Sequence, residues 1–159
     1  MRLTDQYFWN IVFSLFFVSL VVSGTVIVQS VGIHNFHDIP LSDAIIITLA
    51  TFRFTRLMVY DKITAFFREQ FYNAKTLRGG AVVLEKPARG PRRTLADLLS
   101  CPWCISVWGA ATILFFYALT EYAWYPILLL ALSGAATTLQ LLSNMMGWKA
   151  EQLKKDVGE

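Results

Sequence analysis

The stretch YFWNIVFSLFFVSLVVSGTVIVQSV, residues 7–31, contains no charged side chain. Residues 106–120 and 124–148 are also free of charge, although charged residues make up 16% of the 159-residue chain. A soluble domain spreads charge over every element, whereas runs of about 20 apolar residues are typical of membrane-spanning helices. The sequence therefore predicts an all-α integral membrane protein with a single domain, residues 1–159.

Four spans are predicted, and each is long enough to cross about 30 Å of hydrocarbon at about 1.5 Å per residue. The first run is too long for the apolar region of a cleaved secretory signal, which has about 7–15 residues, so we expect an uncleaved anchor. The two cysteines of the chain are too few for a disulfide framework. The expected spans are residues 7–31, 41–60, 102–119 and 124–147.

Lysine and arginine predict the orientation of these spans. The connection 61–101 and the tail after residue 147 are rich in basic residues, and Arg2 precedes the first span. The connections 32–40 and 120–123 contain neither lysine nor arginine. Because basic segments stay on the cytoplasmic side, we expect both termini and the 61–101 loop in the cytoplasm, with the protein in the bacterial cytoplasmic (inner) membrane.

The 61–101 loop contains several distinct patterns. Residues 61–73 predict an amphipathic helix lying in the membrane interface, and the alternative is a cytoplasmic helix that packs on its own domain. The glycines and apolar run of residues 78–85 favour a short strand or hairpin arm. Residues 86–93 are basic and rich in proline and glycine, so an irregular segment is expected. Residues 94–97 resemble a capping box, which predicts the start of a short helix.

Arg89, Arg92 and Arg93 are the candidates for contact with lipid headgroups. Basic residues near a membrane surface attract anionic lipids by about 1 kcal/mol each. The alternative is that these charges only hold the loop in the cytoplasm. No stacking aromatic residues are interleaved with them, so nucleic acid is not an expected partner.

The Cys101-Pro102-Trp103-Cys104 motif stands where the polar loop meets the third predicted span. Proline is favoured at the first position of a helix, so Cys101 takes the cap position and Cys104 the first turn, where free backbone N–H groups favour thiolate. Three interpretations remain open: a thiol–disulfide couple, a zinc site, or a structural corner of small buried thiols with Trp103 as an interface anchor. Zinc prefers four ligands, so this site would need the cysteines of a second copy.

Arg53 and Arg56 lie three residues apart on one face of the second predicted span. Charge inside a membrane is costly, and by default it indicates a functional site. Asp61 is the nearest carboxylate to Arg53; backbone carbonyls, lipid phosphate and the cysteine motif are the other possible partners. The alternative is a pair of structural arginines that fix the span. The candidate cluster at the inner interface is Arg53, Arg56, Asp61, Cys101, Trp103 and Cys104.

Small residues predict the packing of the third and fourth spans. At three- and four-residue spacing they let helices approach closely in a membrane. With the short 120–123 connection, this pattern predicts an antiparallel hairpin of the two spans. The small residues are Ser106, Gly109, Ala110, Ala131, Gly134, Ala135 and Thr138.

The segments TFRFTRL (51–57), DKI (61–63), FR (67–68) and LLSCPWC (98–104), followed by Trp108, resemble a family of small bacterial and phage membrane proteins. This family is catalogued as domain of unknown function 1360, and some members are labelled sporulation proteins. The resemblance covers about residues 43–119, and the first span looks like an addition to the family core. Ser106 stands where we expect a family glycine. The resemblance supports the fold and the motifs and implies no activity.

The expected function is non-enzymatic. We expect a membrane assembly component that binds a protein partner, or a second copy of itself, through its cytoplasmic face, without a cofactor. The first rival is a cytoplasm-facing thiol redox or zinc site at Cys101 and Cys104. The second rival is a phage-type pore-forming or lysis-related protein.

Overall fold

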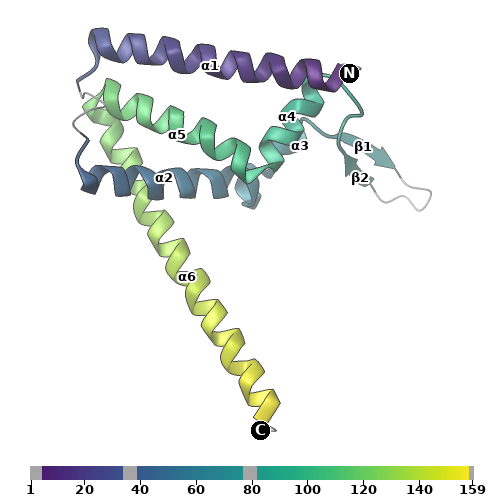
Figure 1. Cartoon of the computed structure of the whole chain (residues 1–159). Coiled ribbons are helices and arrows are strands. Elements are labelled where there is room, and N and C mark those ends of the chain that lie inside the picture. Colours follow the sequence, from purple (N-terminus) through teal and green to yellow (C-terminus); the bar gives the residue numbers. More distant parts are fainter. Residues whose placement is uncertain (1–4, 34–38, 77–81, 158–159) are drawn as a thin grey trace.

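The computed structural model describes residues 5–33, 39–76 and 82–157. Four long helices dominate it: α1 (Asp5–Val31), α2 (Leu41–Val59), α5 (Pro102–Leu119) and α6 (Trp124–Val157) (Figure 1). The short elements are η2 (Lys62–Thr64), α3 (Ala65–Glu69), β1 (Asn73–Thr76), β2 (Val82–Glu85), α4 (Pro91–Ser100) and η3 (Glu121–Ala123).

Three of the described helices, α1, α5 and α6, are long and apolar enough to cross a membrane. The second predicted span forms α2, but Asp43, Arg53 and Arg56 interrupt its apolar character, so α2 does not belong to this group. The helices therefore indicate a membrane protein, with three spans supported by length and composition. The last helix continues to Val157, ten residues beyond the predicted end of the fourth span at residue 147.

Helices α1 and α5 run in the same direction and α2 runs against them (Figure 1). The Phe17 and Trp108 rings, 4.7 Å apart between centroids, join the first halves of α1 and α5. At the other end of these helices, the Ile33 amide donates a hydrogen bond of 2.9 Å to the carbonyl of Ala118. The starts of α1 and α5, together with α4, therefore lie at one end of the bundle, which we call the loop end.

Helix α2 is the centre of the packing, because both α5 and α6 lie against it. Ala50 of α2 is fully buried in a cluster that includes Ile113 and Tyr117 of α5 and Ile127 and Ala131 of α6. By contrast, α5 and α6 make few contacts with each other and diverge in Figure 1. The predicted antiparallel hairpin of the third and fourth spans is therefore wrong.

Two of the small residues that suggested this hairpin face α2 instead. A Cβ atom added to Gly109 would lie 2.7 Å from the Phe54 ring, and one added to Gly134 would lie 2.6 Å from the carbonyl oxygen of Leu49. Both distances are too short for a real contact, so α2 approaches each neighbour only because the facing residue has no side chain. The three- and four-residue spacing of small residues correctly marked positions where helices approach closely, but the wrong pair of helices was assigned to them.

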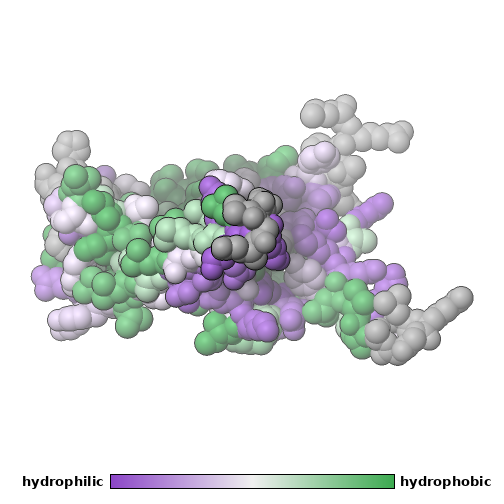
Figure 2. Space-filling view, turned by 90° about the horizontal axis from the view of Figure 1, so that it is seen from below, coloured by the Kyte–Doolittle hydropathy of each residue, from purple (hydrophilic) through white to green (hydrophobic). Residues whose placement is uncertain are grey.

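The second half of α6 leaves the bundle, and every residue from 139 to 150 is exposed (Figure 1). Hydrophilic residues gather on the side of Figure 2 that holds α4 and the hairpin, whereas the opposite side is mainly hydrophobic. This division follows the sequence, because the basic 61–101 connection forms the loop end and the charge-free runs form the helices.

The predicted amphipathic helix 61–73 forms only η2 and the five-residue α3. Ile63 is 72% and Phe66 is 69% exposed, whereas Thr64 and Arg68 bond to carbonyl groups at the end of α2. The interfacial helix and its alternative, a helix packed on its own domain, both stay predictions. The hairpin arm predicted at residues 78–85 is confirmed in β2, while residues 78–81 lie outside the described part of the chain.

Helix α4 corrects two expectations about the basic segment. It begins at Pro91, so residues 91–93 are helical rather than irregular. Gly90 precedes it with φ 94°, a left-handed conformation that glycine adopts without strain, and proline at the first helical position needs no N–H partner. Thr94 thus lies inside the helix and is buried, so the capping box predicted at residues 94–97 is wrong.

We expect Gly134→Ala to destabilise the contact between α2 and α6 and so to lower the stability of the protein. The new methyl group would meet the Leu49 carbonyl, and overpacking of this kind costs about 1–3 kcal/mol. Thermal unfolding of the detergent-solubilised protein measures this loss. Gly147→Ala is the matched control in the same helix, because no atom lies within 4 Å of its added Cβ. A loss of stability for Gly147→Ala equal to that for Gly134→Ala would contradict the packing described.

Candidate functional site

The six candidate residues of the inner interface all belong to the loop end. Asp43 meets Tyr117 and Phe54 meets Gly109, so α2 and α5 run antiparallel along their length. This register brings the last turn of α2 level with the first turn of α5. The structure therefore gathers Arg53, Arg56 and Asp61 at the same end as Cys101, Trp103 and Cys104. Among the described residues, however, no hydrogen bond or ion pair joins the arginines to the cysteine motif.

Arg53 forms an ion pair with Asp61, with 3.1 Å between Nη2 and Oδ2. Asp61 is the carboxylate that sequence spacing indicated as nearest, so this partner is confirmed. The two side chains are 19% and 27% exposed, so the pair is largely shielded. The Arg53 Nε atom is buried and has no hydrogen-bond partner among the described residues. A carboxylate within the chain therefore compensates the charge of the shielded Arg53.

Arg56 is held by aromatic rings rather than by a carboxylate. Its guanidinium carbon lies 5.5 Å from the centre of the Tyr60 ring and 6.0 Å from that of Phe52. Rings at these distances attract a cation through their negative faces. Within the part of the chain that the structure describes, its buried Nε atom also lacks a hydrogen-bond partner. Arg53 and Arg56 therefore share a helix face but have different partners.

Arg68, which the sequence marked only as part of the family segment at residues 67–68, holds the end of α2. Its Nη1 atom donates to the carbonyl of Met58 at 2.8 Å and to that of Asp61 at 3.1 Å. Thr64 Oγ1 donates to the Leu57 carbonyl. These bonds satisfy carbonyl groups left free at the end of α2, and a cation there also matches the helix dipole. A basic residue shortly after a helix end is the signal that could have indicated this role.

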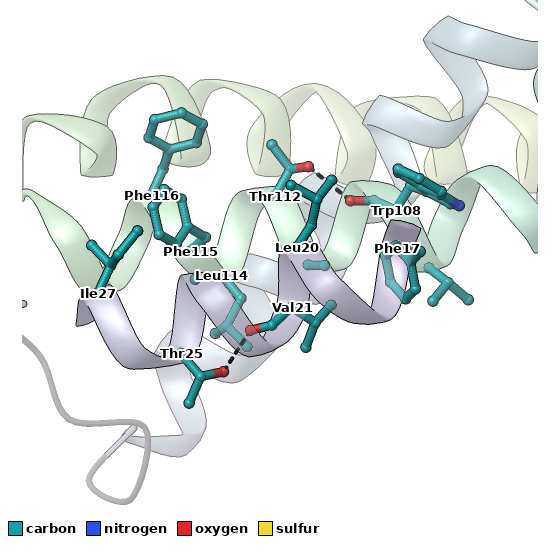
Figure 3. A pocket seen from close by; sticks show the side chains of 13 residues that line it. Phe17, Leu20, Val21, Thr25, Ile27, Trp108, Thr112, Leu114, Phe115 and Phe116 are labelled. Carbon is teal, nitrogen blue, oxygen red and sulfur yellow. Dashed lines mark hydrogen bonds between the residues drawn. The ribbon is translucent and has the colours of Figure 1, made fainter. Parts of the chain in front are cut away.

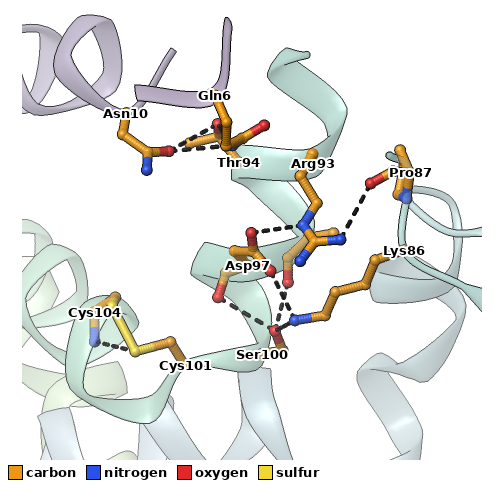
Figure 4. Close-up of polar contacts among 11 residues, drawn as sticks. Gln6, Asn10, Lys86, Pro87, Arg93, Thr94, Asp97, Ser100, Cys101 and Cys104 are labelled. Atoms are coloured by element: carbon orange, nitrogen blue, oxygen red, sulfur yellow. Dashed lines mark hydrogen bonds and ion pairs between the residues drawn. A yellow bond between two sulfur atoms is a disulfide. The ribbon is translucent and has the colours of Figure 1, made fainter. Parts of the chain in front are cut away.

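The cysteine motif forms the corner between α4 and α5 (Figure 4). Cys101 is the cap residue of α5 and Pro102 its first residue, as predicted. The Cys104 amide donates to the Cys101 sulfur at 3.3 Å, and the two sulfur atoms are joined in a disulfide. Cys104 is exposed and Trp103 is 84% exposed. The expectation of small buried thiols is therefore wrong, because the corner is open at Cys104 and its sulfurs are bonded.

Metal binding has no further support within this chain. Among the described residues, no three side chains of His, Cys, Asp or Glu come together as a metal site. A site shared with a second copy stays a hypothesis.

Lys86, which follows β2, forms a charged cluster with Arg93 and Asp97 of α4 (Figure 4). Asp97 accepts hydrogen bonds of 2.8 Å from Lys86 Nζ and from Arg93 Nε. Burial alone would raise the pKa of Asp97, but the hydrogen bonds and charges of both cations outweigh it and lower the pKa below its usual 3.8. A lowered folded pKa means that the cluster stabilises α4 above about pH 4 and loses this effect as the pH falls further.

The arginines proposed for lipid headgroups differ in their contacts. Arg93 is committed to Asp97, so it is a poor headgroup ligand. Arg92 donates to the carbonyl of Gln70 at 2.8 Å but remains exposed, as does Arg89. Arg89 and Arg92 are therefore the candidates that the structure leaves accessible.

Helix α1 is fastened to the loop end by Thr94 of α4 (Figure 4). Gln6 Nε2 donates to Thr94 Oγ1 at 2.8 Å, and Thr94 Oγ1 donates to Asn10 Oδ1 at 3.1 Å. This network replaces the capping role predicted for Thr94. Because Gln6 and Asn10 are more than 80 residues from Thr94, the sequence around Thr94 gives no indication of these bonds.

An apolar groove lies between α1 and α5 (Figure 3). Its volume is about 540 Å³, and nearly all of its lining is apolar. Phe17, Leu20 and Val21 line it from α1, and Trp108 and Phe115 line it from α5. Sequence reasoning missed this groove, because the pairing of α1 with α5 creates it.

A family described as "Protein of unknown function (DUF1360)" has a sequence profile that matches residues 46–143. The chain belongs to this family. The DUF1360 match runs from α2 into α6 and includes the ion pair and the cysteine corner, while α1 lies outside it. This agrees with the expectation that the first span is an addition to the family core.

Two proteins of Bacillus subtilis (strain 168) are similar to this DUF1360 chain. "Sporulation protein YjcA" is 34% identical over 103 residues, which cover 62% of this chain and 87% of the relative. "UPF0713 protein YngL" is 37% identical over 99 residues, which cover 60% and 74%. No solved structure matches the chain.

Removal of the Asp61 charge should destabilise this protein. Asp61→Asn leaves the shielded Arg53 without its ion-pair partner, and an uncompensated polar group shielded from water costs about 1–3 kcal/mol. The Lys75–Glu85 ion pair provides the matched control, because its side chains are 63% and 55% exposed and water screens their charges. For Glu85→Gln we expect a loss below about 1 kcal/mol. Equal effects of both substitutions on thermal unfolding in detergent would refute the importance of the Arg53 pair.

Proposed function

We propose that this protein crosses the bacterial cytoplasmic membrane four times, and that α2 is a span in addition to α1, α5 and α6. Helix α2 runs alongside α5 and packs against both α5 and α6, so it shares the direction of α5 through a bilayer. Its charges have partners in the chain: Asp43 with the Tyr117 hydroxyl, Arg53 with Asp61, and Arg56 with two aromatic rings. Paired charges of this kind are tolerated within membrane helices that face other helices.

In this arrangement the loop end faces the cytoplasm. The basic residues of the 61–101 connection lie there, and the positive-inside rule favours that side. The exposed Ile63, Phe66 and Trp103 side chains then lie at the inner membrane interface, where apolar and indole groups are favourable. Arg89 and Arg92 are positioned to meet anionic headgroups.

The function we propose for this cytoplasmic face is the non-enzymatic binding of a protein partner. The observation that carries it is the β1–β2 hairpin, which projects from the helices (Figure 1). All eight residues of its two strands are exposed, and they include Val82, Val83 and Leu84. A two-stranded hairpin has little stability by itself in water, and both of its edges are free among the described elements.

Strand addition is the binding mode that such a hairpin supports. A partner that pairs with an open edge satisfies the backbone groups there and covers the apolar side chains. Lys75 is paired with Glu85 and Lys86 with Asp97, so the exposed Val82, Val83 and Leu84 select the partner, and an extended segment with apolar side chains is the complementary one. A cytoplasmic protein with such a segment, or one anchored in the same membrane, fits this surface.

The experiment compares Val82→Lys with Leu153→Lys by co-purification and mass spectrometry from the native membrane. The Val82 and Leu153 side chains are 63% and 62% exposed, so Leu153→Lys is a closely matched control for the added charge and the lost apolar surface. We expect Val82→Lys to lose the partner by at least about tenfold, a change of about 1.4 kcal/mol, because it puts a charge on the contact surface. Leu153→Lys, on the tail of α6, should retain it.

The proposal fails if the same proteins co-purify with both variants and the wild type in equal amounts. It also fails if no protein is enriched with the wild type after crosslinking in intact cells. A partner lost from Leu153→Lys alone would move the binding surface to α6.

A further inference from the structure

The two cysteines are bonded to each other at the loop end, where the basic residues gather. Stable disulfides belong to oxidising compartments, whereas disulfides in the bacterial cytoplasm are usually transient and redox-active. A disulfide on the basic side of a membrane protein is therefore an exchangeable bond rather than a structural brace. We infer that Cys101 and Cys104 form a thiol–disulfide exchange site for a cytoplasmic dithiol protein. This inference uses the orientation proposed above and is independent of the hairpin partner.

The exposure of the two cysteines decides which sulfur is attacked. Cys104 is exposed on the first turn of α5, whereas Cys101 is half-buried between α4 and α5. Trp103, between them, is itself 84% exposed, so this corner of the chain is open. An incoming thiolate has to approach along the line of the disulfide, and access selects Cys104.

The cap geometry decides which sulfur leaves. The Cys104 amide donates to Cys101 Sγ at 3.3 Å, at the positive end of an 18-residue helix. Both features favour negative charge on the Cys101 sulfur. Attack at Cys104 therefore releases Cys101 as the better leaving group, so exposure and charge stabilisation favour the same direction of cleavage.

The exchange balances without a further reactant. The first thiolate of the dithiol protein forms a bond to Cys104 Sγ, the Cys101–Cys104 bond breaks, and Cys101 leaves as a thiolate. The second thiolate of the dithiol protein then attacks its own partner sulfur, which releases Cys104 and closes a disulfide in that protein. Two electrons and two protons move from the dithiol protein to the cysteine pair.

The position of attack is tested on the oxidised full-length protein in nanodiscs. Reduced glutathione is the probe, and acid quenching followed by peptide mass spectrometry locates the mixed disulfide. We expect the adduct on Cys104 to exceed that on Cys101 by at least about tenfold, because both access and leaving-group stability favour it. Cys101→Ser and Cys104→Ser each keep one thiol, and they calibrate the detection of the two adducts. A predominant adduct on Cys101, or no adduct with a bond that stays closed, overturns the assignment.

The exchange in cells is tested by acid quenching of growing bacteria and a gel shift with a large maleimide. We expect a reduced pair during growth, oxidation after diamide, and return to the reduced form once diamide is removed. A pair that stays oxidised throughout, or one that diamide never closes, overturns the inference. Labelling of intact cells with an impermeant maleimide separates the two proposals: rapid labelling of the reduced pair refutes the orientation, whereas the nanodisc result judges the chemistry by itself.

Discussion

The charged side chains of α2 have to be compensated where the helix lies between two apolar neighbours, and the rest of the structure depends on how this is done. Arg53 reaches Asp61 just beyond the helix end, and Asp43 accepts a hydrogen bond of 2.5 Å from the Tyr117 hydroxyl at the other end. These contacts tie α2 to the chain at both ends. Because an uncompensated charge at such positions is costly, they constrain both where α2 stops and how it faces α5.

Close packing follows from the same central position of α2. The helix approaches α5 at Gly109 and α6 at Gly134, where the neighbouring surface has no side chain. The carbonyl groups at its end are satisfied by Arg68 and Thr64, which fold the chain back after the last turn. Polar contacts therefore hold the loop end together, whereas the opposite half of the bundle combines the apolar cluster around Ala50 with the hydrogen bond between Tyr117 and Asp43.

Several features of the loop end could be predicted from local sequence. Asp61 was the carboxylate within reach of Arg53, and proline after Cys101 indicated a helix that starts with a cysteine cap. Other features could not, because their partners are distant in the chain. Thr94 looked like a cap residue, yet it bonds to Gln6 and Asn10 more than 80 residues away. The helices that meet at Gly109 and Gly134 were likewise misassigned, since a small residue shows that something approaches but not what.

The sequence by itself determined that the chain consists of membrane-length helices joined by a basic loop, because charge-free runs and clustered lysine and arginine act locally along the chain. It also determined that α5 begins at the cysteine motif, since proline and cap preferences depend only on neighbouring residues. The tertiary structure alone decided that α2 is the central helix, that the hairpin projects without a partner among the described residues, and that Cys104 is the open side of the disulfide. These properties depend on which surfaces pack together, and the packing is decided by the shape and charge of segments that are far apart in the chain.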